Sequence, residues 1–159
     1  MNARTLELLE YKKVQEMLAA QTDTPMGKSL ARNAYPVGVR GAKELQKVGR
    51  EVEQAISTTS SPSIREVPDV RVKVSGAMQG VILTGVELRD ILMVLNAFDT
   101  VSTWIGRLAT DFINLHRIRE MIPRLPFLVE KLARTVDDQG VIKDSASEKL
   151  GTIRGSMRQ

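Results

Sequence analysis

The sequence contains no cysteine, and this absence limits the chemistry available to the protein. Without thiols, a disulfide framework, thiol catalysis and cysteine-ligated zinc are excluded. No apolar run approaches the roughly 18 to 20 residues that a membrane-spanning helix needs, and residues 1–10 do not have the pattern of a signal peptide. We therefore expect a cytoplasmic protein with no membrane partner.

Aromatic residues are also scarce, at 4% of the chain. This scarcity argues against a single-strand platform in which stacked rings hold successive bases. Lys and Arg outnumber Asp and Glu by 23 to 19, an excess too small to distinguish a phosphate-binding surface from an ordinary one. If the chain contacts nucleic acid, we expect it to contact the backbone.

Apolar residues recur at helical spacing along most of the 159 residues, which predicts an all-α fold, an irregular helical bundle in a single domain. A loop is expected over 58–68, whereas residues 68–79 fit either a short helix or an extended segment. Thr24 before Pro25 is a helix-start signal, and Thr84 with Glu87 forms a capping box. The expected helices span about 3–21 (one bent helix or two short ones), 25–33, 42–57, 84–108, 112–122, 125–136 and 145–159.

The segment that follows the helix expected at 125–136 is rich in aspartate and contains one glycine. Gly140 can adopt the left-handed conformation of a tight turn, which predicts a small β-hairpin near residues 136–142. Asp137, Asp138 and Asp144 lack the alternating oxygen ligands and final glutamate of a calcium-binding loop. Turn formation therefore explains them better than metal binding.

The C-terminal segment predicts a helix that is still amphipathic where the sequence stops. Ser145 and Glu148 have the spacing of a second capping box. Ile153 and Met157 continue the apolar side up to the end of the sequence, with no stop signal. We interpret residues 145–159 as a truncated helix.

Two further patterns resemble catalytic or nucleotide-binding motifs but lack essential parts. Gly27-Lys28-Ser29 looks like the end of a phosphate-binding P-loop, yet that motif needs a glycine where Thr22 stands, and a preceding strand. His116 is the single histidine, and no nucleophile motif accompanies it. We expect no catalytic, cofactor or metal site in this chain.

The densest run of positive charge is the remaining candidate site. Near a corner between two helices, these side chains could contact the phosphate backbone of a nucleic acid. The alternative is an ordinary solvated face, because Glu120 and Glu130 dilute the run. The candidate contacts are Arg117, Arg119, Arg124, Lys131 and Arg134.

The aspartate-rich segment also carries a family resemblance. Residues 136–147 read Val-Asp-Asp-Gln-Gly-Val-Ile-Lys-Asp-Ser-Ala-Ser, and Lys149-Leu150 and Ile153-Arg154 follow. This stretch resembles the signature Asp-x-x-Gly-x-Val-x-Asp-Ser-Ala-Ser-x-x-Leu-x-x-Ile-Arg of the bacterial MutS-two proteins, paralogues of the mismatch-repair protein MutS. Weaker matches follow the family's order from the start of the chain: Thr5-Leu6-Glu7, Leu9 to Val14, Gly27-Lys28, Leu30-Ala31, Gly80 to Leu83 and Glu87-Leu88.

The resemblance implies that the chain is the N-terminal core and lever part of a larger protein. Such proteins have an inserted clamp, an ATPase domain that binds ATP and Mg²⁺ and forms a homodimer, and usually a C-terminal Smr nuclease domain. The resemblance implies a parent that binds branched or damaged DNA and suppresses recombination, or one that splits stalled ribosomes. Residues 145–159 would begin the helix towards the lever and clamp, and the fragment itself would be a monomer.

A second hypothesis does not depend on the family. The amphipathic helices and seven methionines would suit a free-standing helical adaptor that binds a partner protein through one apolar face. A small enzyme is a third hypothesis, but the pattern of a catalytic constellation is missing.

Overall fold

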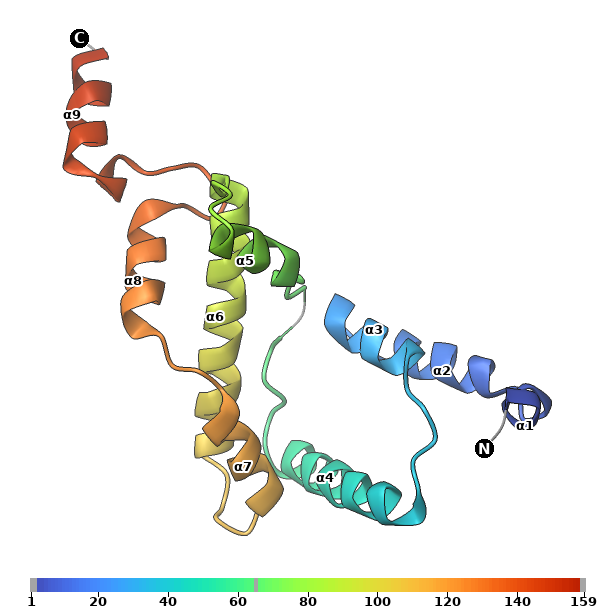
Figure 1. Ribbon diagram of the computed structural model, residues 1–159. Coiled ribbons are helices and arrows are strands. Elements are labelled where there is room, and N and C mark those ends of the chain that lie inside the picture. Colours follow the sequence, from blue (N-terminus) through green and yellow to red (C-terminus); the bar gives the residue numbers. More distant parts are fainter. Residues whose placement is uncertain (1–2, 65, 158–159) are drawn as a thin grey trace. The chain divides into compact units, whose positions relative to one another are not determined.

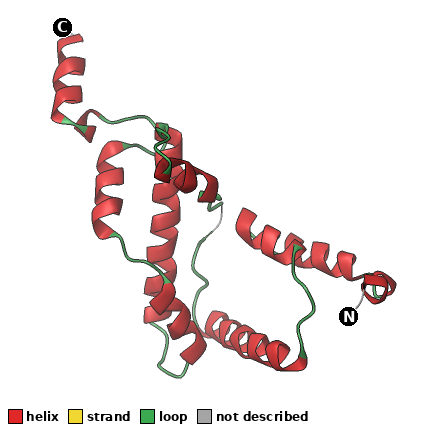
Figure 2. Cartoon of the chain, in the orientation of Figure 1, coloured by secondary structure: helices red, strands yellow, loops and turns green. Residues whose placement is uncertain are grey.

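The computed structural model describes residues 3–64 and 66–157, and in this part of the chain the fold is all-α, as predicted (Figures 1 and 2). A 3-10 turn, η1 (Asp144–Ala146), precedes the last helix. The end of the helix predicted over 145–159 lies outside the described residues. The helices are α1 (Ala3–Leu8), α2 (Tyr11–Ala20), α3 (Pro25–Arg32), α4 (Val39–Thr58), α5 (Arg71–Met78), α6 (Gly85–Gly106), α7 (Ile113–Met121), α8 (Pro126–Thr135) and α9 (Glu148–Met157).

The chain divides into two structural units. Unit 1 comprises Met1–Glu66 and Thr100–Ile122, and unit 2 comprises Val67–Asp99 and Pro123–Gln159. The residues of α6 are shared between the two units. That residues 1–159 form a single domain stays a prediction.

The predicted hairpin is wrong as a hairpin, although its turn is present. A single antiparallel bridge joins Val136 to Ile142, and the described residues form no strand. Helix α8 ends at Thr135, residues 137–141 form the turn, and the Lys143 N–H donates to the Thr135 carbonyl, so the bridge does not extend into a ladder.

Residues 3–21, for which one bent helix or two short helices were expected, form two short helices, α1 and α2. Glu10 lies between α1 and α2 with a φ of 50°, a left-handed conformation that interrupts the helix. Helix α3 begins as predicted, because the Thr24 hydroxyl accepts a hydrogen bond from the Gly27 N–H at 3.1 Å. Helices α2 and α3 pack against each other and bury the small side chains Ala19 and Ala31.

The main core of unit 1 lies where α4 meets α7. Its buried members come from α4, the end of α6, the segment between α6 and α7, and α7 itself, and are Ala55, Ile105, Leu108, Phe112 and Leu115. The half-buried Trp104 flanks this core, and its indole N–H donates to the Thr59 hydroxyl at 3.1 Å and to the Ser60 carbonyl at 2.9 Å. The indole therefore anchors the loop after α4 to the core.

Helix α7 has its N-terminus capped by a residue of another helix. Phe112, at the N-cap position, makes no side-chain cap. The Glu51 carboxylate on α4 instead accepts the backbone N–H groups of Asn114 at 2.9 Å and Leu115 at 3.0 Å, and the Asn114 side-chain amide at 2.6 Å. A carboxylate here satisfies two N–H groups that lack intrahelical partners and complements the helix dipole.

In unit 2, the capping box predicted for α6 is confirmed. The Thr84 N–H donates to the Glu87 carboxylate at 2.8 Å, and the Glu87 N–H donates to the Thr84 hydroxyl at 3.3 Å. The hydrogen bond from the Thr84 N–H, with help from its hydroxyl, holds the pKa of Glu87 below its usual value. The segment 68–79, for which two conformations were open, contains helix α5.

A buried carboxylate ties α5 to α6. Asp90 is 8% exposed and pairs with Lys73 of α5 and, at 2.7 Å, with Arg89. Burial acts to raise the pKa of Asp90, but the hydrogen bonds and charges of Lys73 and Arg89 outweigh it, so the pKa lies below its usual value. This carboxylate is therefore ionised and fully paired at neutral pH.

A candidate nucleic-acid interface beside a helix joint

The five candidate basic residues do not share one surface of a single unit. Arg117 and Arg119 lie on α7 in unit 1, and Arg124 belongs to unit 2, in the loop before α8. Lys131 and Arg134 both lie on α8 in unit 2 and line the same hollow. The structure thus brings together the last two.

Arg119 has a structural partner in unit 1. Its Nε donates to the Ser102 carbonyl at 3.0 Å, near the C-terminus of α6, where a cation complements the helix dipole. Gly106 leaves space for the guanidinium, because a Cβ at that position would lie 2.9 Å from Nη2. Arg119 therefore holds the end of α6 against α7.

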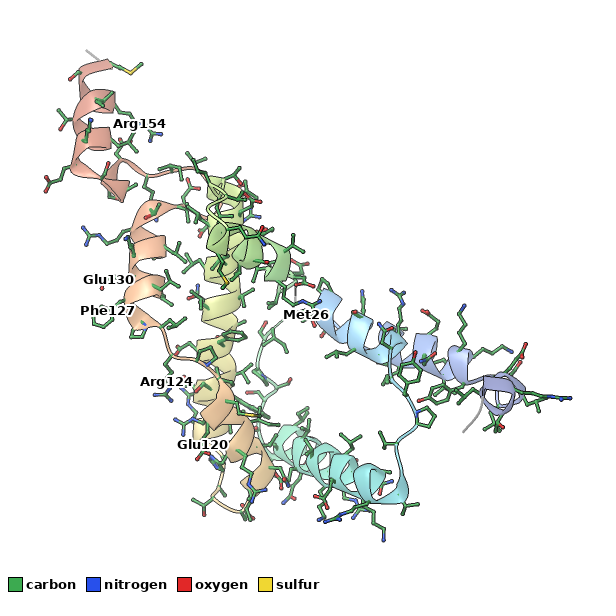
Figure 3. The ribbon with its side chains drawn as sticks, viewed as in Figure 1. Met26, Glu120, Arg124, Phe127, Glu130 and Arg154 are labelled. Atoms are coloured by element: carbon green, nitrogen blue, oxygen red, sulfur yellow. The ribbon has the colours of Figure 1, made fainter. Side chains whose placement is uncertain are left out.

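The charged face of α8 carries an aromatic residue, Phe127, that is not among the candidates predicted from the sequence. Phe127, Lys131 and Arg134 recur at spacings of four and three, so they share one side of the helix. Phe127 is 86% exposed, whereas Leu132 on the opposite side is 7% exposed. In Figure 3, Phe127 and Glu130 project from α8. Phe127 lies outside the apolar stripe of Leu128 and Leu132, and this position is the sequence signal that could have predicted its exposure.

These residues line a surface hollow of about 390 Å³ between α8 and the start of α9. Arg134 makes a long ion pair with Glu130, at 4.0 Å, and both side chains are about 70% exposed, so this pair contributes little. Two carboxylates, Glu130 and Glu148, offset the charges of the two cations, so the lining of the hollow has no net formal charge. The other lining residues are Glu130, Thr135, Ser145, Ala146, Ser147 and Glu148.

On the side of α8 towards its C-terminus, the chain forms a joint, which we define as residues 136–147. The last four carbonyls of a helix lack intrahelical partners. Lys143 satisfies two of these carbonyls in α8. Its N–H donates to the Thr135 carbonyl and its ammonium to the Ala133 carbonyl, both at 2.8 Å. The Ser145 hydroxyl donates to the Arg134 carbonyl at 2.8 Å. The fourth carbonyl, that of Leu132, accepts a hydrogen bond from the Val136 N–H, so the joint caps α8 completely.

The turn of the joint rests against the start of α6. Asp137 closes the turn by accepting the N–H groups of Gln139 at 2.9 Å and Val141 at 2.8 Å. Gly140 has a φ of 77°, and a Cβ there would lie 2.7 Å from the Val86 Cα. A Cβ on Gly85 would likewise overlap the Gly140 carbonyl. Glycine is needed at both positions for this backbone contact.

The start of α9 corrects the second capping-box prediction. Ser145 does not cap α9, because its hydroxyl is used on α8. The helix begins three residues later than expected, at Glu148, and Ser147 caps it by accepting the Leu150 N–H at 3.2 Å. The residues 144–146 between form η1.

No family model matches the chain. Its sequence is nevertheless similar over nearly all of its length to curated proteins named Endonuclease MutS2. Identity is 31% over 170 residues with the Exiguobacterium sibiricum protein, 29% over 167 with that of Latilactobacillus sakei and 28% over 159 with one from Bacillus cereus. These alignments cover 98–100% of the chain. The chain belongs to the MutS2 family.

The chain spans about one fifth of the length of these MutS2 relatives. The stretch that resembles the MutS-two signature, residues 136–154, coincides with the joint and the first turns of α9. Its aspartate, glycine and serine residues are those that close the turn, contact α6 and cap the helices. In this chain, the stretch therefore forms a connection between helices.

The segments that resembled catalytic motifs have structural partners in this MutS2 chain. Gly27 donates its N–H to the cap of α3, and His116 lies with Nε2 3.0 Å from the Ala109 carbonyl. Within 3–64 and 66–157, no group of three or more potential ligands is placed to hold a metal ion. None of the helices described is long and apolar enough to cross a membrane.

Proposed function

We propose that this chain is a core and lever module of a MutS2-type DNA-binding ATPase and endonuclease that suppresses homologous recombination. The observation that carries the proposal is the match of almost the whole chain to about one fifth of proteins named Endonuclease MutS2. ATP and Mg²⁺ bind elsewhere in this homodimeric parent, and the module alone is a monomer without a catalytic site.

The helices and their caps suit a part that transmits movement between the ATPase and the clamp. A packed helical core does not deform continuously, so it passes on displacement as rigid-body motion. In unit 2, the joint caps the end of α8 and leads directly into α9. In this proposal α9 is the start of the helix towards the clamp.

The test uses the full-length parent protein that contains this chain. Two glycines inserted between Thr152 and Ile153 of α9 should leave basal ATP hydrolysis unchanged and weaken its stimulation by DNA about fivefold or more, the low end of typical allosteric coupling. The same insertion between Ser61 and Pro62, in the loop after α4, is the matched control. Undiminished stimulation in the α9 variant would refute the lever role.

The proposed nucleic-acid contact is tested on the present chain. We expect weak, sequence-independent binding to duplex or branched DNA. The logarithm of the binding constant should fall with the logarithm of the salt concentration with a slope of about −3, from roughly 0.9 per phosphate and about three phosphates. Changing Lys131 and Arg134 to Ala should reduce the slope by about 2. Lys43 and Arg50, exposed on α4, provide the control pair. An unchanged slope in the α8 variant would move the contact elsewhere.

A parent that acts on ribosomes is the second candidate, and one observation favours it. Phe127 lies exposed beside Lys131 and Arg134, the combination with which proteins stack an unpaired base and hold its phosphate. Phe127→Ala should then weaken binding of single-stranded RNA by about 1 to 3 kcal/mol and leave duplex DNA binding unchanged. Equal effects on both nucleic acids would count against this candidate.

A further inference from the structure

Arg154 connects α9 to the joint that precedes it. Its Nη1 donates to the Ile142 carbonyl at 2.7 Å and to the Asp144 carboxylate at 2.8 Å. Both charged side chains are partly buried, at 35% and 41% exposure, which shields this ion pair from solvent more than a fully exposed pair. Figure 3 shows Arg154 on α9. One guanidinium thus returns from the second turn of α9 to two residues of the joint.

A close backbone approach lies next to this contact. A Cβ on Gly151 would lie 3.2 Å from the Asp144 carbonyl, so glycine lets α9 lie tightly against η1. Gly155, one turn further on, has nothing within 4 Å of such a Cβ. The close approach of α9 to the joint is therefore found at Gly151 and not at Gly155.

The joint in turn is fixed to α8. Ile142 pairs with Val136, and Lys143 and Ser145 hold the terminal carbonyls of α8. A short path of hydrogen bonds therefore runs from Arg154 through the joint to α8. Ser147, the residue just before α9, is extended, with φ −157° and ψ 150°, and its backbone is the pivot about which α9 could turn.

We propose that Arg154 is a positioning residue that latches α9 to the joint and so fixes the direction of α9 relative to α8. When the latch opens, α9 stays helical and turns about Ser147. The proposal rests on the proposed function only for its consequence, namely that the latch sets the angle at which the lever leaves this module.

The absence of cysteine makes the test direct, because two introduced cysteines are the only thiols to label. Nitroxides at Ala133→Cys on α8 and Ser156→Cys on α9, both exposed positions, report the distance between the helices by pulsed electron resonance in the 159-residue chain. The otherwise native chain should give one narrow distance distribution. Arg154→Gln should lose it and give a broad one, with helix content by circular dichroism unchanged.

Lys149→Gln is the matched control, since it removes one positive charge from the same helix at an exposed position. It should keep the narrow distribution. Arg154→Lys should restore part of it, because an ammonium keeps the positive charge and can donate a hydrogen bond but lacks the shape of the planar guanidinium.

Three results would overturn the latch. These are a narrow distribution in Arg154→Gln, equal broadening in Lys149→Gln, or a loss of α9 helix content in Arg154→Gln, which would make Arg154 a stabiliser of the helix and not of its direction. All probes lie in unit 2 of this chain. The outcome is therefore independent of whether the parent uses α9 as a lever.

Discussion

Replacing Glu51 with Ala should destabilise unit 1 by about 2 kcal/mol. The Glu51 carboxylate caps α7, although it lies 63 residues before Asn114 in the sequence. It accepts hydrogen bonds from two backbone N–H groups and from the Asn114 side-chain amide. A lost cap costs about 1 kcal/mol, and a lost anion at a helix N-terminus costs about 0.3 to 1 more, with a further contribution from the Asn114 amide. For a chain of this size, a 2 kcal/mol loss lowers the thermal midpoint by about 4 to 8 °C.

Fluorescence of Trp104, the only tryptophan, measures this loss in the relevant unit, because the indole flanks the core that α4 and α7 share. Glu53→Ala removes the same charge from an exposed position on the same helix and should shift the midpoint little. Glu51→Gln should fall between the two, since its carbonyl still accepts a hydrogen bond but carries no charge. Equal midpoints for the Glu51→Ala and Glu53→Ala variants would refute the capping role.

Three further predictions concern other parts of the chain. Because its two cationic partners hold the pKa of Asp90 low, its contribution to stability is present above about pH 4 and is lost as the pH falls below it, so the urea midpoints of the native chain and Asp90→Asn should converge between pH 7 and pH 3. Calorimetric titration with magnesium-ATP should show no heat of binding, and micromolar binding that disappears in Lys28→Ala would reveal a missed site. Gly155→Ala should increase the stability of α9 by roughly 0.5 to 1 kcal/mol, whereas Gly151→Ala should not, because its Cβ would press on the Asp144 carbonyl. Hydrogen exchange of the α9 amides compares the two variants, and equal gains in protection would contradict the close approach of Gly151 to that carbonyl.

Local sequence signals predicted most helices correctly. The caps at Thr24 and Thr84 depend on residues only three positions apart, and the structure confirms both. The start of α9 was wrong for a reason that spacing does not contain. Ser145 and Ser147 are both suitable caps, and the demand of the α8 carbonyls for a donor assigns Ser145 elsewhere.

Long-range contacts were beyond the reach of the sequence patterns. Glu51 is one of several exposed-looking glutamates on α4, and nothing near it in sequence indicates that it caps α7. The basic run behaved similarly. Adjacent positions in sequence suggested one patch, but Arg119 is directed to the Ser102 carbonyl, while Lys131 and Arg134 share a hollow with Phe127.

The contact between Gly85 and Gly140 has a consequence for how this sequence can vary. The two backbones meet where no side chain fits on either partner, so a single substitution at one position has no compensating change at the other. Gly38, Gly49 and Gly155 face open space and can be replaced freely as far as room is concerned. A deep mutational scan would therefore separate the glycines into two classes. We therefore expect both Gly140, in the turn, and Gly85, the first residue of α6, to resist substitution, although 55 positions separate them in the sequence.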